Sequence, residues 1–265
     1  MTWGQCVNTL SFKQELQDFW WFLRQPRLAP RFAQQDLGHG WVTDWTNGLG
    51  VKRLLQWVAF LWLINITVFG PLAAMVATSA GAEHKLDFGR IPWKQAVLWA
   101  PLIEEMVFRY VLRRPSQFFW LIPVTLWCLL SGPQTVTVTV ALAVVVLLIW
   151  RPATAGSQPA LWRQIGLGAQ WPWRWYRWYC RRFAWFFYGS TVLFAALHLY
   201  NFKFDQIELY TLPLLILPQF VTGLVLAWLR VRRGIGASII LHALFNAGPL
   251  LLIMAIMRLL PDLAH

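Results

Sequence analysis

Runs of apolar residues long enough to cross a membrane fill the chain from residue 54 onward. About 20 helical residues cross the roughly 30 Å hydrocarbon core of a bilayer, so such runs are typical of transmembrane helices. The pattern predicts seven spans. They cover residues 54–80, 91–112, 118–130, 135–150, 183–200, 209–229 and 235–260.

The third and fourth spans are short, and Ser131, Gly132 and Pro133 separate them. This break predicts either a tight hairpin between two helices or a kink in one bent element. The fourth run is rich in β-branched residues, but a lone strand in lipid would leave its backbone groups without hydrogen bonds. We therefore expect a helix there as well.

Residues 1–53 lack a long apolar run and mix aromatic, basic and acidic side chains. Within them, residues 14–23 have the two faces of a short amphipathic helix, which ends before Pro26. We expect this helix to lie on the membrane surface as an anchor. The pattern thus divides the chain into an N-terminal interfacial segment, 1–53, and a membrane-embedded domain, 54–265. In the latter, the Trp- and Arg-rich loop 151–182 is expected to lie along the interface.

The composition supports this division, because 58% of the residues are hydrophobic, 13% are charged, and the mean hydropathy is +0.48. A soluble domain carries about twice that share of charged residues. The predicted fold class is therefore all-α. It is a polytopic integral membrane helical bundle with about seven transmembrane helices and additional interfacial amphipathic helices.

The formal net charge is +12, but the basic residues lie between the apolar runs rather than in one patch. Anionic lipid headgroups and membrane topology explain this distribution, so nucleic acid is not an expected partner. Most of the 23 Lys and Arg residues fall in alternate connecting segments that begin with 1–53, which predicts a cytoplasmic N-terminus. Cys6, Cys128 and Cys180 show no spacing typical of a metal site or a disulfide framework.

Few acidic residues, histidines or deeply placed basic residues lie inside the predicted spans, and they are Glu104, Glu105, Arg109, His198 and His242. A charged side chain near the bilayer centre costs roughly 2.5 to 3.5 kcal/mol, so such residues are usually functional or tightly paired. Arg109 is the only basic residue deep within a predicted span, and it follows Glu105 at the four-residue spacing of a helical ion pair. One interpretation is a buried structural ion cluster with two hydrogen-bonded packing histidines.

The same residues can also activate water. A carboxylate can take a proton from water while an imidazole orients that water or supplies a proton to a leaving amine. Asn246 lies four residues after His242, on the same helix face, and its amide N–H suits a developing oxyanion.

These residues form three short motifs, EEMVFR (104–109), FAALH (194–198) and HALFN (242–246). In this order, on separate apolar spans, they resemble the signature of the CAAX-type prenyl endopeptidases and their bacteriocin-processing and immunity relatives. The resemblance covers roughly residues 91–250. It implies a multi-pass intramembrane endopeptidase, with the plasma membrane of a prokaryote as the expected location.

The resemblance also implies a role for each motif residue. Glu104 would activate water with the help of His198, and His242 and Asn246 would stabilise the oxyanion. Glu105 and Arg109 would hold the helix geometry, and Phe194 opens the second motif. The expected partners are a membrane-associated protein or peptide substrate and the lipid bilayer. A prenylated substrate does not follow from the resemblance.

Three alternatives stay open. Two histidines and a glutamate can form a zinc site, although their spacing is not that of a zinc protease motif, and we expect no metal or other cofactor. A transporter or proton relay would use the same residue types but would need a continuous polar path. A non-catalytic membrane adaptor or immunity-type protein of the same fold would not need Glu104.

The site implies a geometry that a structure can test. We expect Glu105 to turn toward Arg109. We also expect residues 183–188 to belong to the cytoplasmic interface, so that the crossing starts near Gly189 and His198 reaches the depth of Glu104. One polar pocket should then contain the four predicted catalytic side chains, which are Glu104, His198, His242 and Asn246.

Overall fold

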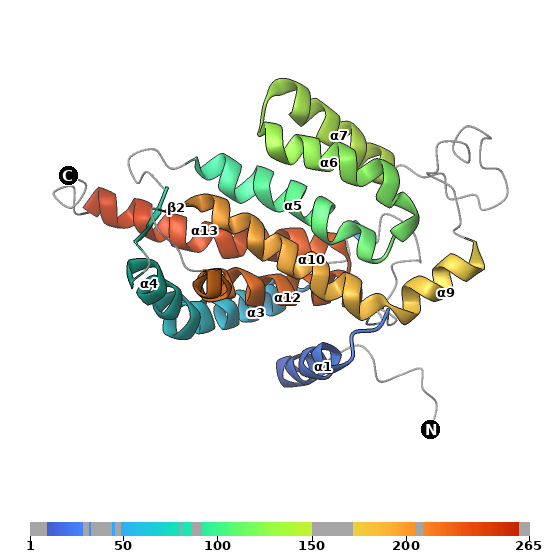
Figure 1. The fold of residues 1–265 in the computed structure, drawn as a ribbon, viewed down its shortest axis with the longest axis horizontal. Helices are drawn as coiled ribbons and strands as arrows, with labels where there is room; N and C mark the ends of the chain where they lie inside the picture. The colour runs from blue at the N-terminus through green and yellow to red at the C-terminus, as the bar shows by residue number, and fades with distance from the viewer. Residues whose placement is uncertain are drawn as a thin grey trace.

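The computed structural model describes residues 10–28, 32, 44–45, 49–79, 81–85, 92–149, 172–204 and 209–259, and these residues are almost entirely helical (Figure 1). The N-terminal part contains α1 (Phe12–Arg24), α3 (Val51–Ile64), a π-helical segment (Asn65–Phe69) and α4 (Gly70–Ser79). The central part contains a π-helical segment (Gln95–Trp99), α5 (Ala100–Phe108), 3₁₀ turns at Tyr110–Leu112 and Pro115–Gln117, α6 (Phe118–Ser131) and α7 (Thr135–Ile149). The C-terminal part contains α9 (Trp173–Arg181), α10 (Phe183–Leu197), 3₁₀ turns at His198–Asn201 and Leu209–Thr211, α11 (Leu212–Leu215), α12 (Leu217–Arg232) and α13 (Ile235–Leu259).

The predicted amphipathic helix is α1. Ser11 caps it, since its hydroxyl accepts from the Gln14 amide while the Gln14 side chain accepts from the Ser11 amide. The helix ends at Arg24, before Pro26, as predicted. Its inward face packs against the bundle, whereas Trp20 and Trp21 are exposed.

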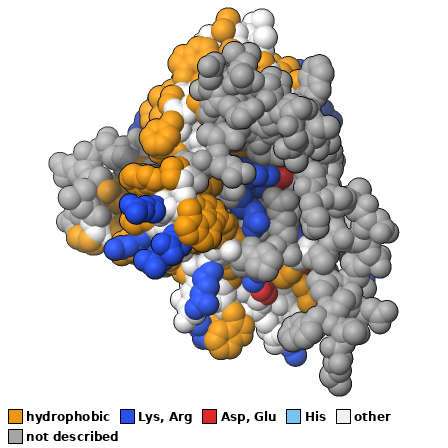
Figure 2. Space-filling view, turned by 90° about the vertical axis from the view of Figure 1, so that its right-hand side faces the viewer, with side chains coloured by type: hydrophobic (Ala, Val, Ile, Leu, Met, Phe, Trp, Pro, Cys, Tyr) orange, Lys and Arg blue, Asp and Glu red, His pale blue; other side chains and the backbone are white. Residues whose placement is uncertain are grey.

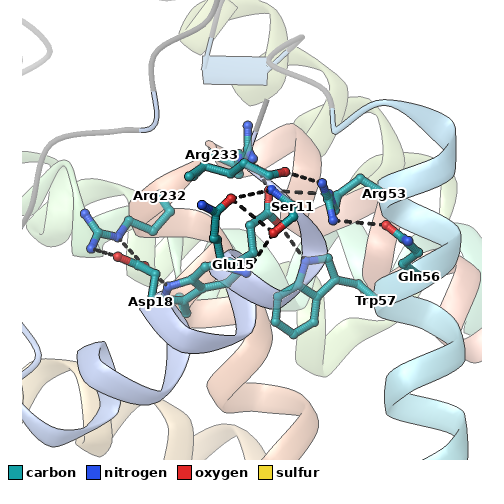
Figure 3. A network of polar contacts seen from close by, with 11 residues as sticks. Ser11, Glu15, Asp18, Arg53, Gln56, Trp57, Arg232 and Arg233 are labelled. Carbon is teal, nitrogen blue, oxygen red and sulfur yellow. Dashed lines mark hydrogen bonds and ion pairs between the residues drawn. The ribbon is translucent and has the colours of Figure 1, made fainter. Parts of the chain in front are cut away.

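A network of ion pairs and hydrogen bonds, here called the N-terminal network, attaches α1 to α3 and α12 (Figure 3). Its centre is Glu15, which is fully buried. The Glu15 carboxylate accepts from Trp57 Nε1 at 2.9 Å and forms ion pairs with Arg53 and Arg233.

One turn further along α1, Asp18 continues this network. It pairs with Arg232 and accepts from Trp228 Nε1 at 2.8 Å. Both ion-pairing side chains are partly exposed, Arg232 by 15% and Asp18 by 24%. The network therefore consists of one buried acidic residue with its partners and one ion pair that water reaches.

The break at Ser131–Pro133 forms a hairpin between α6 and α7 rather than a kink. Gly132 has a φ of 71°, a left-handed conformation that glycine adopts without steric cost, and the two helices pack against each other. The β-branched residues 135–149 form the helix α7, so that prediction is confirmed.

Two short strands, β1 (Ala82–His84) and β2 (Phe202–Phe204), pair in an antiparallel ladder with Glu83 opposite Lys203. The sequence pattern did not predict them. β1 follows α4, and β2 follows the 3₁₀ turn after α10. The ladder therefore links the segment after α4 to the segment after α10 at one end of the bundle.

The helix α12 lies at the centre of the molecule and is buried without interruption from Thr222 to Val231. It packs against α10, α13 and α1, and its Trp228 contacts Trp57 and Phe19 in the main core.

Among the described residues, three helical segments are long and apolar enough to cross a membrane, namely Val51–Ser79, Phe183–Asn201 and Ile235–Leu252. Pro115–Ser131 and Thr135–Ile149 are shorter apolar helices. The all-helical class is thus confirmed, and the number seven stays a prediction. The predicted span at 91–112 is interrupted at Arg109, where α5 has already ended and a 3₁₀ turn begins.

Two glycines let the N-terminal segment approach the start of α13. A Cβ at Gly236 would lie 1.7 Å from the backbone oxygen of Trp45, and one at Gly234, where φ is 133°, would lie 2.6 Å from that of Asp44. Only glycine fits at either position. The approach also buries Asp44 against α12 and α13.

Candidate active site

The three sequence motifs meet where α5, α10 and α13 pack together. Glu104 and Glu105 lie on α5, and Phe194 lies on α10, with His198 directly after that helix. His242 and Asn246 lie on α13. Helix α5 contacts both α10 and α13, so residues far apart in the sequence become neighbours.

Glu105 is the centre of a fully buried group, here called the α5–α13 cluster, which contains Glu105, Arg109, Ser238 and His242. One carboxylate oxygen of Glu105 accepts from Arg109 Nη1 at 2.7 Å and lies 2.9 Å from His242 Nδ1. The other accepts from the Ser238 hydroxyl at 2.5 Å. The predicted ion pair between Glu105 and Arg109 is therefore confirmed, and Glu105 has two further partners.

Phe194 provides the aromatic side of this group. The Arg109 guanidinium lies 3.6 Å from the centre of its ring, a cation–π contact that partly replaces the hydration this charge has lost. A Cβ at Gly223 of α12 would lie 3.0 Å from the Phe194 ring and 3.2 Å from Arg109 Nη2, so glycine allows this close approach.

His242 connects Glu105 to Glu104. Because the Glu105 carboxylate is paired with Arg109 and acts as an acceptor, Nδ1 of His242 carries the hydrogen of their shared bond. Its Nε2 then faces Glu104, 3.8 Å from Oε2. That oxygen of Glu104 is buried and has no hydrogen-bond partner among the described residues.

His198 joins the group through Phe194. Its Nδ1 lies 2.9 Å from the Phe194 backbone oxygen. The Phe194 ring makes T-shaped contacts with both imidazoles, with ring centres 4.8 Å from that of His198 and 5.7 Å from that of His242. The structure thus brings Glu104 and His242 together and places both histidines against Phe194, whereas the pairing of His198 with Glu104 stays a prediction.

Asn246 lies one turn beyond His242 and is half-buried. Its amide donates to the Ala96 backbone oxygen at 2.9 Å, which ties α13 to the segment before α5. An asparagine amide has two N–H donors, and among the described residues this is the one hydrogen bond that they make.

The predicted interfacial position of residues 183–188 stays a prediction, but the structure shows which helix they belong to. The structure breaks the helix at Arg182, between α9 and α10, and Phe183 to Tyr188 form the first turns of α10. Phe183 and Phe187 are fully buried against other helices, and this packing makes the whole of α10 one continuous element.

Two features of the site were not predicted. Ser238 lies four residues before His242, so its position on the same helix face is the signal that could have identified it. Arg230 is the other, because it lies just beyond the predicted span at 209–229 and is nevertheless fully buried in the protein.

Arg230 fixes the turn that follows α5. Its guanidinium donates to the backbone oxygens of Arg109 and Tyr110, at 3.2 and 2.9 Å, and pairs with Asp44 at 2.5 Å. Residues 44 and 230 are too distant in sequence for a spacing rule to pair them. This contact holds the end of the helix that carries Glu104 and Glu105.

Within the part of the chain that the structure describes, no group of three or more His, Cys, Asp and Glu side chains is arranged to hold a metal ion. The expectation of a metal-free site is not tested by this observation.

Comparison with protein families identifies a family for this chain. The family of type II CAAX prenyl endopeptidases described as Rce1-like matches residues 91–248. The chain belongs to this family. The family and the apolar helices of the chain together identify it as a membrane protein of the CAAX protease group. No curated protein and no solved structure matches the chain. The matched range includes every predicted site residue and excludes α1, α3 and Asp44.

Proposed function

We propose that this protein is an intramembrane endopeptidase in which Glu104 activates a water molecule to hydrolyse a peptide bond. The observation that carries this proposal is the gap of 3.8 Å between Glu104 Oε2 and His242 Nε2, with the carboxylate oxygen buried and unpaired among the described residues. A buried unpaired carboxylate oxygen is costly, so it is uncommon outside sites that bind water, an ion or a substrate.

The gap has the size that a water molecule needs. It is too long for a direct hydrogen bond, yet a water about 2.8 Å from both atoms would bridge them. In this position Glu104 accepts one hydrogen of the water. The neutral Nε2 of His242 accepts the other, so the oxygen lone pairs are free to attack.

The reaction then needs three steps. Glu104 takes a proton from the water, and the hydroxide oxygen bonds to the carbonyl carbon of the peptide. The proton that Glu104 took moves to Nε2 of His242, and this imidazolium and the Asn246 amide then donate hydrogen bonds to the oxyanion, the roles that the family resemblance implies, before the same proton returns to Glu104. A proton passes to the leaving nitrogen by way of Glu104 and His198, the C–N bond breaks, and an acid and an amine are released.

Glu105 acts through His242 rather than on the substrate. Its carboxylate holds Nδ1–H and so determines which nitrogen faces Glu104. A negative partner also stabilises the imidazolium that the oxyanion step requires. The contacts with Arg109 and Ser238 keep that carboxylate in place.

The membrane setting belongs to the same proposal. It comprises seven spans within residues 54–265, a cytoplasmic N-terminal segment, and the plasma membrane of a prokaryote. The substrate is a membrane-associated protein or peptide, whether or not it is prenylated, and the mechanism uses no metal.

The test compares protein termini in cells that carry the wild type with those that carry Glu104→Gln. This change keeps the shape of the side chain and removes the proton acceptor, so cleavage should fall by about 10²- to 10⁴-fold. Asp18→Asn is the matched control, since it removes a carboxylate from the N-terminal network.

Termini made by the wild type should persist in the Asp18→Asn cells and disappear with Glu104→Gln, while all three proteins show similar melting temperatures. Normal cleavage by a folded Glu104→Gln protein would reject the mechanism. It would favour a non-catalytic adaptor or immunity-type role for the same fold.

A further inference from the structure

A groove of about 1120 Å³ opens between the C-terminal part of α5 and α6 on one side and α9 and α10 on the other. Ligand pockets commonly enclose about 300 to 1,000 Å³, so this one is large. Aromatic and aliphatic side chains form most of its walls, among them Phe108, Phe119, Trp175, Trp178, Leu193 and Leu197.

The two hydroxyl groups on the walls already have partners within the protein. The Ser190 hydroxyl donates to the Phe187 backbone oxygen at 3.1 Å, and the Tyr179 hydroxyl donates to that of Leu112 at 2.8 Å. Burial raises the pKa of Tyr179, so this hydroxyl stays protonated. A ligand in the groove therefore meets an apolar surface.

The groove is long as well as apolar. Its wall on α10 extends from Trp185 to Leu197, which at 1.5 Å per residue is about 18 Å. An extended hydrocarbon chain suits this shape. An extended peptide does not, because its backbone N–H and C=O groups would find no free partner on such walls.

Basic side chains stand at one end of the groove. Helix α9 turns Trp175 and Trp178 toward the groove, and it places Arg174, Arg177 and Arg181 on another face, three or four residues apart. These arginines are exposed, and among the described residues no acidic side chain forms an ion pair with them. Figure 2 shows Lys and Arg side chains beside hydrophobic ones on the side of the molecule that carries α9.

We propose that this groove binds an anionic phospholipid, with an acyl chain between α5, α6 and α10 and the phosphate at the arginines of α9. Trp175 and Trp178 suit the membrane interface, where the acyl chain of a lipid meets its headgroup, because tryptophan is enriched at that depth. Each basic residue near an anionic lipid surface contributes about 1 kcal/mol, so three arginines favour an anionic headgroup over a zwitterionic one. Glu104 does not line the groove, and the proposal does not depend on the proposed hydrolysis.

Gly189 offers a way to fill the groove. It lines the wall on α10, and a Cβ added there meets nothing within 4 Å. Gly189→Trp should therefore occupy the path of the acyl chain without disturbing the helix packing. Val192→Trp is the matched control, because Val192 lies on the same helix, is 47% exposed and does not line the groove.

The experiment measures, by native mass spectrometry, how much phosphatidylglycerol or phosphatidylcholine the detergent-purified full chain retains. Wild type and Val192→Trp should retain phosphatidylglycerol preferentially, and Gly189→Trp should lose most of it. The triple change Arg174→Gln, Arg177→Gln and Arg181→Gln should reduce the preference by about fivefold or more, since even one such arginine contributes about that factor.

The control for charge removes three exposed basic residues from the N-terminal segment, Lys13→Gln, Arg24→Gln and Arg27→Gln, and it should leave the preference unchanged. If Gly189→Trp does not fold, Ala196→Phe, which also lines the groove, replaces it. Equal retention of the two lipids by the wild type would overturn the proposal. Unchanged retention of phosphatidylglycerol by a folded groove variant would also overturn it. If that variant in addition loses proteolysis, the groove is assigned to the substrate instead.

Discussion

The α5–α13 cluster and the N-terminal network are both built from carboxylates and guanidinium groups, yet water reaches them differently. In the α5–α13 cluster, Glu105 and Arg109 are fully buried. In the N-terminal network, Glu15 is buried, but its partners Arg53 and Arg233 are exposed by 20% and 14%.

This difference determines what each group can do. A buried ion pair has lost its hydration, so removal of one partner leaves a charge that nothing compensates. An ion pair that water reaches is screened, and its contribution is small. The α5–α13 cluster can hold a reactive geometry around Glu104 because its members have no alternative partner in solvent. The N-terminal network serves to attach α1, a helix outside the family match, to α12 within it.

The largest effect on stability is expected for Arg109→Leu. It leaves the Glu105 charge buried without its ion-pair partner, which typically costs about 3 to 5 kcal/mol. Glu105→Gln should lower stability to a similar degree, because it strands Arg109. Unfolding of the purified proteins in detergent measures both. An Arg109→Leu protein that melts like the wild type would show that the Glu105–Arg109 pair does not stabilise the fold. The contrast between the α5–α13 cluster and the N-terminal network would then be wrong.

A smaller effect is expected for Glu15→Gln. The amide keeps an acceptor for Trp57 but cannot pair with both arginines, and the loss of one buried hydrogen-bonding partner costs about 1 to 3 kcal/mol. The same unfolding measurement applies, with Gln17→Ala on the exposed face of α1 as its control. A loss as large as that of Arg109→Leu would mean that the two groups do not differ as their exposure indicates.

A still smaller effect is expected for Asp18→Asn, within about 1 kcal/mol, because both Asp18 and Arg232 are partly exposed. The effect should fade when the salt concentration is raised, whereas that of Arg109→Leu should persist. Melting curves at low and high salt separate the two. Equal salt dependence would contradict the difference in solvent access.

The smallest effect is expected for the cysteines, since neither Cys128 nor Cys180 belongs to the α5–α13 cluster or the N-terminal network. Thiol reagents, and replacement of all three cysteines by alanine, should leave proteolysis unchanged. A chelator should likewise have no effect under the proposed metal-free mechanism. Loss of activity in the cysteine-free protein would reopen a cysteine mechanism, and stoichiometric zinc in active protein would reopen a metal one.

Local patterns predicted the features that depend on neighbouring residues. The apolar runs predicted the helices, the Ser131–Pro133 break permitted the α6–α7 hairpin, and the amphipathic pattern with Pro26 predicted α1. The i,i+4 spacing of Glu105 and Arg109 predicted their ion pair, because helix geometry alone brings such residues together.

Contacts between distant segments were not predictable in this way. The burial of Arg230 depends on Asp44 and on the backbone of the turn after α5, and neither partner has a fixed spacing from it. The start of α10 at Phe183 likewise depends on the buried packing of Phe183 and Phe187, which local polarity does not reveal.

The sequence by itself determined the membrane class, the helical segments and the three family motifs, since these follow from composition and from spacing along one helix. Only the tertiary structure decided that His242 lies between Glu105 and Glu104 and that Asn246 bonds to Ala96. It also decided that α9 and α10 enclose an apolar groove with α5 and α6. The physical reason is that helix periodicity fixes which side chains share a face, whereas the packing of one helix on another fixes which faces meet.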